Sequence, residues 1–449
     1  MKLITITKKI IKRITKIKKE TLITPVNINF SFTQSGNYTE TRKERSVVFY
    51  RNNYYHLYYL SQALRKRGWD TLTVSLEPPE SPSSLYYHGE DLNLFTPNKK
   101  LFLHQVTNFF KIAQDRYEVF HVSNDFGLSF FPHNYDEEDP WDLVQWKEQG
   151  KKIAYTISGC LSATTQSSVE KWSLQDKNRN ISVCNTCIWK HQPHVCSDEK
   201  SDSFGRKVEK YVDVIFAEGL PALDYIALPK AMREPTTMCL DPIVWHPELE
   251  IPQKHKIGKT KKEILIYHGV GNYKLRTDAQ GKNIKGTRAI LAAIETLKTE
   301  GFPVRLIFST SLPNREVRFI QAQADIIVDQ LNYGRYGAIA REGMMLGKPV
   351  ICYIHPFEYR KEDYLKSLEE CPLVSAREET VYDVLKDLIL HPDKREAIGA
   401  RSRHYALKWH SPDACAERYE QIYDLLMANN PLIYPSQWSY FNPKMEKSL

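Results

Sequence analysis

The stretch DIIVDQLNYGRYGAIAREGMMLGKPV, residues 325–350, says more about the fold than any other part of the sequence. Its first five residues read as a buried strand, and a helix over Ala338–Met345 precedes a second strand that begins near Pro349. The loop before the helix contains Gly334 and Gly337, and glycine lets a backbone approach a ligand closely. The stretch predicts a strand–loop–helix unit whose helix start offers N–H groups to a phosphate.

The alternation of strands and helices extends outward from this unit in both directions. On its own side of the chain it predicts strands at Ile264–His268 and Val304–Phe308, a helix over Thr287–Thr299, and closing helices near 378–390, 392–408 and 411–427. Further toward the N-terminus it predicts the strands Ser46–Tyr50, Asp70–Ser75, Tyr117–Val122, Lys151–Ile157 and Val212–Ala217, and a helix over Tyr54–Arg67. A linker rich in proline and charge, 247–262, separates the two series.

Strands that alternate with helices pair in parallel, so each series predicts a doubly wound sheet. We therefore expect an α/β protein with two Rossmann-like domains that face each other across a cleft, where ligands usually bind. The expected organisation is a leader (1–20), a first domain (21–250) with a cysteine-rich insertion (160–196), a second domain (251–427) and a tail (428–449).

Charged residues in the second domain have a pattern that suits a nucleotide. Lys282 and Lys285 lie three residues apart before a helix, where paired cations can hold a diphosphate. Glu342 lies one turn into the helix of residues 338–345, where a carboxylate can accept both hydroxyls of a ribose. From pattern alone, solvated surface lysines and an ordinary strand–loop–helix remain open as alternatives.

Together these segments resemble the GT-B glycosyltransferases, specifically the retaining group called family 4. The resemblance covers most of 262–427. It includes the lysine–Gly286–Thr287 helix start, Tyr336-Gly337-x₄-Glu342-Gly343-Met344, the Gly347–Val350 strand entry and the closing segment 391–411. It implies a hexosyltransferase-type enzyme that moves a sugar from a nucleoside diphosphate to an acceptor with retention, without a catalytic cofactor or metal.

The resemblance also assigns roles to residues of the donor site. Lys282 and Lys285 would hold the diphosphate, with Arg276 as the alternative to Lys282. Glu342 would hold the ribose, and the loop Gly334–Gly337, including Tyr336, would lie against the sugar. The family commonly has a second glutamate where this chain has Gly334. The nearby Asp329 and Gln330 are the candidates to replace it, and Asp329 is the catalytic candidate.

The first domain resembles the family only in its alternation of strands and helices. His121 ends a strand where an acceptor would enter, and family members often have a functional histidine near such strand ends. A hydrogen-bonded structural histidine is the equal alternative. Asn52 and Asn53 follow the first strand, where many relatives have a glycine-rich loop, and they are candidate acceptor-side contacts.

The cysteine-rich insertion contains the ligand types of a structural zinc site. Cys184 and Cys187 have the Cys-x₂-Cys spacing that chelates one ion, and Cys160 and Cys196 would complete a tetrahedron. The surrounding segment is polar and has little to bury, which is where a metal helps most. Free thiols, or a redox or iron–sulfur function, remain as alternatives.

The leader concentrates the charge of the chain. The net charge is +8, and residues 1–20 contain eight basic side chains and one acid, with aliphatic residues at helical spacing. Such a segment predicts an amphipathic helix on an anionic membrane surface, with a disordered basic tail as the alternative. It has no secretory signal and no long apolar run, so we expect a cytoplasmic protein, peripheral on the inner face of the membrane.

The expected function is transfer of a sugar to a glycan or a lipid-linked acceptor, as in polysaccharide biosynthesis. The alternative is a non-catalytic GT-B-like subunit that binds a glycan or a protein, which Gly334 in place of an acid would favour. Nucleic acid is not an expected partner, because the basic charge is confined to the leader and is not interleaved with aromatic residues.

Overall fold

The computed structural model describes residues 44–51, 54–79, 89–123, 127–157, 159, 164–173, 183–217, 230–232, 238–310, 312–355 and 366–430. The leader, Asn52, Asn53 and Cys160 lie outside the described residues, as does most of the tail. None of the helices in this part of the chain has the length and apolar character needed to cross a bilayer.

The first half is built on a parallel sheet whose described strands pair in the order β3-β2-β1-β4-β5-β6-β7. These strands are β1 (Ser46–Tyr50), β2 (Asp70–Ser75), β3 (Leu92–Asn93), β4 (Val119–Val122), β5 (Lys152–Thr156), β6 (Val214–Phe216) and β7 (Ala231–Met232). The order reverses beside β1, which lies between β2 and β4. Doubly wound sheets bind ligands at the carboxyl ends of the strands near such a reversal.

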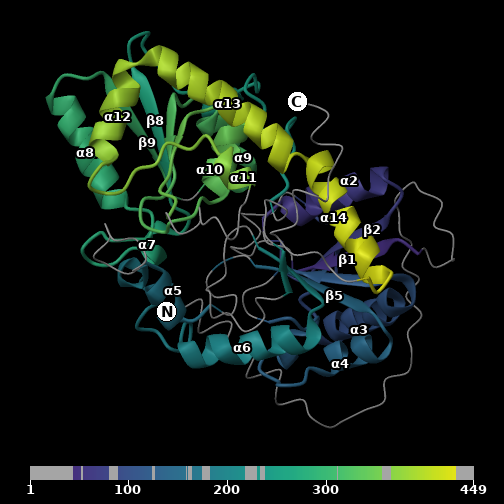
Figure 1. Ribbon diagram of the computed structural model, residues 1–449. Coiled ribbons are helices and arrows are strands. Elements are labelled where there is room, and N and C mark those ends of the chain that lie inside the picture. Colours follow the sequence, from purple (N-terminus) through teal and green to yellow (C-terminus); the bar gives the residue numbers. More distant parts are fainter. Residues whose placement is uncertain are drawn as a thin grey trace.

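Helices cover both faces of this sheet, because successive strand residues point to opposite faces and here nearly all are buried. Val47 and Phe49 of β1 pack with α2 (His56–Lys66), whereas Val48 and Tyr50 pack on the other side. That second layer consists of α3 (Lys99–Arg116), α4 (Trp141–Glu148) and α6 (Asp198–Tyr211) (Figure 1).

The second half contains a smaller parallel sheet with the order β11-β10-β8-β9. Its strands are β8 (Ile264–Gly269), β9 (Val304–Ser309), β10 (Ile326–Val328) and β11 (Val350–Ile351). Its helices are α7 (Tyr273–Arg276), α8 (Thr287–Thr299), α9 (Asn314–Gln321), α10 (Ala338–Met345), α11 (Lys366–Glu369), α12 (Val381–Leu390) and α13 (Pro392–His410). Ile290 of α8 and Leu385 of α12 share a core on one face, and Val317 of α9 and Met344 of α10 join the core on the other.

The last helix, α14 (Pro412–Met427), returns to the first half and lies beside α2 (Figure 1). The ring of Tyr419 stacks on Phe216 at 4.3 Å between centroids, and Glu420 accepts a 3.1 Å hydrogen bond from the Trp69 indole. The sequence analysis counted this helix in the second domain, 251–427, and the structure packs it against the first sheet. The tyrosines of α14 are buried against the first sheet, so by packing this helix belongs to the first half.

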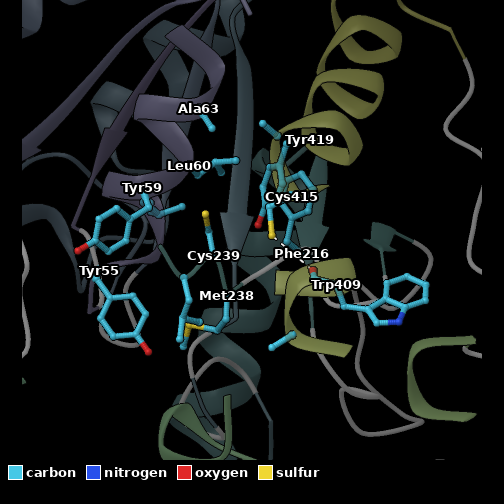
Figure 2. Close-up of a cluster of buried hydrophobic side chains, with 14 of the residues drawn as sticks. Tyr55, Tyr59, Leu60, Ala63, Phe216, Met238, Cys239, Trp409, Cys415 and Tyr419 are labelled. Atoms are coloured by element: carbon cyan, nitrogen blue, oxygen red, sulfur yellow. Dashed lines mark hydrogen bonds between the residues drawn. The ribbon is translucent and has the colours of Figure 1, made fainter. Parts of the chain in front are cut away.

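A continuous apolar core joins the two halves. Figure 2 shows Tyr55 and Tyr59 of the first half close to Met238 and Cys239, with Cys415 and Tyr419 of α14 on the other side. Tyr55 also packs on Trp245, with ring centroids 4.6 Å apart, and the same cluster includes Met344 of α10. Burial of this surface holds the halves in one arrangement.

The predicted α/β fold with two doubly wound sheets is confirmed. The strand Ser46–Tyr50 and the helices Thr287–Thr299 and Ala338–Met345 have the predicted bounds. Helices α4, α6 and α9 were not predicted, because each is short or largely polar and buries only a few side chains.

Candidate functional site

A cavity of about 320 Å³ lies between the two halves of the chain. In the first half its wall includes residues that follow β5 and β6, such as Ile157 and Ala217. In the second half Gly269, Thr310 and Gln330 line it, at or just beyond the ends of β8, β9 and β10. The cavity therefore lies at the carboxyl ends of both parallel sheets, where this architecture places ligands.

Glu342 lines this cavity from α10 and is almost fully buried. Its Oε1 accepts hydrogen bonds of 3.0 Å from both the Tyr55 hydroxyl and the Asn314 amide, and its Oε2 accepts one of 2.7 Å from the Gln321 amide. Burial raises the pKa of the carboxyl, and the three hydrogen bonds and the Arg341 charge oppose that rise. The carboxylate is therefore held in one orientation at the cavity wall.

Lys285 also lines the cavity, and its ammonium contacts the carboxylate of Asp329. Asp329 is fully buried, and its other oxygen accepts a 2.8 Å hydrogen bond from the Gly337 N–H at the start of α10. An ammonium has three donors, so the contact with Asp329 leaves others for a ligand. Asp329 thus ties the lysine to the helix start.

The loop that carries Lys285 is held by a buried polar network. The Asn283 side chain accepts from the Lys285 N–H at 3.0 Å and donates to the Thr287 hydroxyl at 3.0 Å. His268, at the end of β8, contacts the same hydroxyl at 2.9 Å, and burial lowers its pKa to about 4. Gly286 has a φ of +73°, and a Cβ there would meet Leu331 at 2.9 Å, so this turn requires glycine.

Of the two lysines predicted to hold the diphosphate, the structure places only Lys285 in the described wall of the cavity. Lys282 is exposed and is absent from the described wall of the cavity, whereas Arg276 of α7 lines it. Arg276 is the residue that the sequence offered as the alternative. A further cation, Arg341, is buried beside Glu342, lines the cavity and lies over the ring of Tyr336 at 5.4 Å.

The loop predicted to lie against the sugar is only partly at the cavity. Tyr336 and Gly337 line it, together with Arg335. Gly334 has a φ of +84°, and a Cβ there would meet the Trp172 ring at 2.6 Å and His355 at 2.9 Å. Glycine at this position is therefore a steric requirement, and no acid could occupy it in this arrangement.

Neither candidate catalytic residue is in the described wall of the cavity. Asp329 lies behind Lys285 and Gly337, as described above. His121 is fully buried, with Nδ1 2.6 Å from the Tyr423 hydroxyl and Nε2 2.7 Å from the Thr156 hydroxyl. Burial lowers the pKa of His121 well below its usual value, so the ring is neutral. This geometry corresponds to the structural alternative, and Thr156 lies between the ring and the cavity.

Several residues of the site were not predicted. Tyr55, Asn314 and Gln321 hold Glu342, and they come from α9 and the segment before α2. His56, at the start of α2, lines the cavity from the first half. The sequence offers no signal for these residues, because each is polar or aromatic within an ordinary amphipathic segment.

The insertion places three of its cysteines in the described part of the chain. Cys184, Cys187 and Cys196 are half-buried, lie on short turns and form no disulfide among the described residues, and Cys160 lies outside them. Across the ranges that the structure describes, no three His, Cys, Asp or Glu side chains are grouped to hold a metal ion. Burial raises the pKa of the Cys187 thiol, and the charge of Arg276 opposes that rise.

The arrangement can bind an anion beside a polyol. Lys285, Arg276 and Arg341 line one cavity with the start of α10, and cations with helix N–H groups favour a diphosphate. Glu342 lies in the same wall and is the only acidic residue among the described lining residues. A carboxylate there can accept hydroxyl groups.

Comparisons with known proteins give the fold a name. No protein-family model matches the sequence, and no curated protein matches it. Among solved structures, sucrose-phosphate synthase from Thermosynechococcus elongatus is 12% identical, with a TM-score of 0.51, over 86% of this chain and all of the other. A glycosyltransferase from Rickettsia africae is 11% identical, with a TM-score of 0.52, over 86% of this chain and 99% of the other. HepE of Anabaena in complex with UDP-glucose is 10% identical, with a TM-score of 0.50, over 84% and 99%. At these identities the likeness shows the GT-B fold.

Proposed function

We propose that this chain is a glycosyltransferase that takes a sugar from a nucleoside-diphosphate sugar. The observation that carries the proposal is the meeting of Lys285, Arg341 and Glu342 in one cavity between two Rossmann-like sheets. The cations and the start of α10 would hold the diphosphate, and Glu342 would hold the ribose. The similarity to a fold whose solved members include a complex with UDP-glucose supports this assignment.

In the proposed reaction, a hydroxyl oxygen of the acceptor bonds to the anomeric carbon of the sugar while the bond from that carbon to the diphosphate breaks. The products are a glycoside, a nucleoside diphosphate and a proton. Negative charge grows on the departing diphosphate, so Lys285 and Arg341 stabilise the transition state more than the ground state. Retention of the anomeric configuration, and membership of family 4, are parts of the proposal that rest on the sequence motifs.

Binding of nucleoside diphosphates, measured by calorimetry, tests the donor assignment. We expect UDP or another nucleoside diphosphate to bind the wild type, and Glu342→Gln to weaken binding at least about tenfold, since an amide cannot accept as a carboxylate does. Glu295→Gln, on the exposed face of α8, is the matched control and should bind as the wild type does. Equal affinity of Glu342→Gln and wild type, with both folded by thermal melting, would remove the assigned role.

The acceptor side of the proposal rests on the sequence. We propose a glycan or lipid-linked acceptor, approached from the cytoplasm, with the basic residues 1–20 on an anionic membrane surface. Co-sedimentation with vesicles that contain anionic lipid tests the second point, and deletion of residues 2–20 should abolish it. The alternative is a non-catalytic binding subunit. Release of nucleoside diphosphate from a nucleotide sugar in the presence of a purified acceptor distinguishes an enzyme from such a subunit.

A further inference from the structure

The insertion between β5 and β6 reaches the cavity that lies between the two halves. Thr164, just before α5 (Gln166–Ser173), lines the cavity. Figure 1 shows α5 near α7, the short helix that carries Arg276. The charge of Arg276 acts on the thiol of Cys187, which lies in the same insertion as α5. Residues of the first half therefore cover one side of the donor cavity.

Trp172 of α5 packs directly against residues of the second half. Its ring occupies the space beside Gly334, where an added Cβ would lie 2.6 Å from the indole. The indole also stacks on His355 at 4.3 Å between centroids, with 29° between the planes. The backbone N–H of His355 donates a 2.8 Å hydrogen bond to the Gly334 carbonyl. Trp172 is 6% exposed, so the indole fits into a slot formed by the second half.

The same indole supports a cation of the cavity wall. The guanidinium of Arg335 lies over the Trp172 ring at 5.0 Å from its centroid, and Arg335 lines the cavity. A guanidinium held over an aromatic ring still has N–H groups that can donate to a ligand. Among the described residues the Trp172 indole N–H has no hydrogen-bond partner. The ring is therefore placed by its faces, against His355 and Arg335.

We propose that Trp172 is a positioning residue for the donor. From the first half it holds Arg335 and the loop 333–337 at the cavity, so that the guanidinium faces the diphosphate of a nucleotide sugar. This inference rests on the proposed function. It assigns to the cysteine-rich insertion a part in donor binding, which couples donor affinity to the docking of one half on the other.

Calorimetry of nucleoside diphosphate binding tests the inference. Trp172→Ala should raise the Kd about tenfold, the size of effect expected when a stacked guanidinium loses its support. Trp172→Phe keeps an aromatic face and should stay within about threefold of the wild type. Trp141→Phe, on α4 and away from the cavity, is the matched control and should leave the Kd unchanged.

A double-mutant cycle separates positioning from a general structural effect. If Trp172 acts through Arg335, then Trp172→Ala should add little to the loss already caused by Arg335→Gln. Additive losses, or a Kd for Trp172→Ala equal to that of the wild type, would overturn the proposal. Should Trp172→Ala fail to fold, Trp172→Leu, which keeps apolar bulk without a π face, carries the same expectation in the same cycle.

Hydrogen exchange in the absence of ligand distinguishes failure of the inference from failure of the proposed function. The amides of residues 333–337 should exchange faster in Trp172→Ala than in the wild type, whatever the protein binds. A wild type that binds no nucleoside diphosphate would overturn the proposed function. Unchanged exchange at 333–337 would instead show that Trp172 does not hold the loop.

Discussion

The hydroxyl of Tyr55 donates a 3.0 Å hydrogen bond to the carboxylate of Glu342, 287 residues further along the chain. Tyr55 precedes α2 in the first half, and Glu342 lies on α10 in the second. The bond joins the two halves at the wall of the cavity, because Glu342 is one of its lining residues. A ligand that binds this carboxylate would therefore contact the same group that joins the two halves.

Loss of this bond should destabilise the protein. Tyr55→Phe leaves a buried carboxylate with one donor fewer, and the free energy of unfolding should fall by about 1–2 kcal/mol. Denaturant unfolding of the wild type and the variant measures the difference. Tyr382→Phe is the control: its hydroxyl contacts Glu300 at the surface, so it should change stability by less than about 0.5 kcal/mol. An equal effect of the two variants would contradict the importance of the buried bond.

Gly334 should tolerate no side chain. Gly334→Ala adds a strained φ and also a clash with Trp172, so it should lower stability and weaken donor binding. Gly301→Ala is the matched control, because Gly301 has a similar φ of +86° with nothing within 4 Å of an added Cβ. Thermal melting of both variants isolates the clash from the backbone strain. An equal fall in melting temperature for the two variants would show that Trp172 moves aside without destabilising the protein.

The two lysines should differ in their effect on the donor. Lys285→Met removes a buried cation from the cavity wall and should weaken nucleoside diphosphate binding at least about tenfold. Lys282→Met removes an exposed charge and should weaken it less than about twofold, an effect that salt should largely abolish. Calorimetry at low and high salt measures both. A larger loss for Lys282→Met would restore the sequence-based assignment.

Acid should destabilise the fold through His268. Burial lowers its pKa to about 4, so the folded state binds fewer protons than the unfolded state between pH 4 and 6.5. The contribution of His268 to the free energy of unfolding is fully present above pH 6.5. It falls by about 3 kcal/mol as the pH falls toward 4. His268→Gln should make denaturant stability less dependent on pH between 7 and 5. His404→Gln, exposed on α13, should leave the dependence unchanged.

Zinc in the insertion stays a prediction of the sequence. Purified protein should contain about one equivalent of zinc, and Cys184→Ser with Cys187→Ser should remove it. Cys371→Ser, outside the insertion, is the control. Elemental analysis decides the matter, and a wild type with less than about a tenth of an equivalent would end the idea.

The sequence predicted the fold better than the site. Ala338–Met345 is recognisable as a helix after a strand and a glycine loop, because that information is local. The sequence also singled out Lys285 and Glu342, and the structure places both at the cavity wall, while their roles stay predictions. For His121 the sequence left a functional and a structural histidine equally open, because a strand end can face a cavity or a neighbouring helix. Here the ring contacts Tyr423 of α14.

The sequence by itself determined the alternation of strands and helices and the glycine loop before the helix of residues 338–345. Periodicity and backbone conformation are properties of neighbouring residues, so a single chain reveals them. The tertiary structure alone decided which polar groups meet. Tyr55 reaches Glu342, Trp172 fills the space beside Gly334, and Arg276 rather than Lys282 lines the cavity. These contacts join residues far apart in the chain, and their strength comes from burial that no local pattern records.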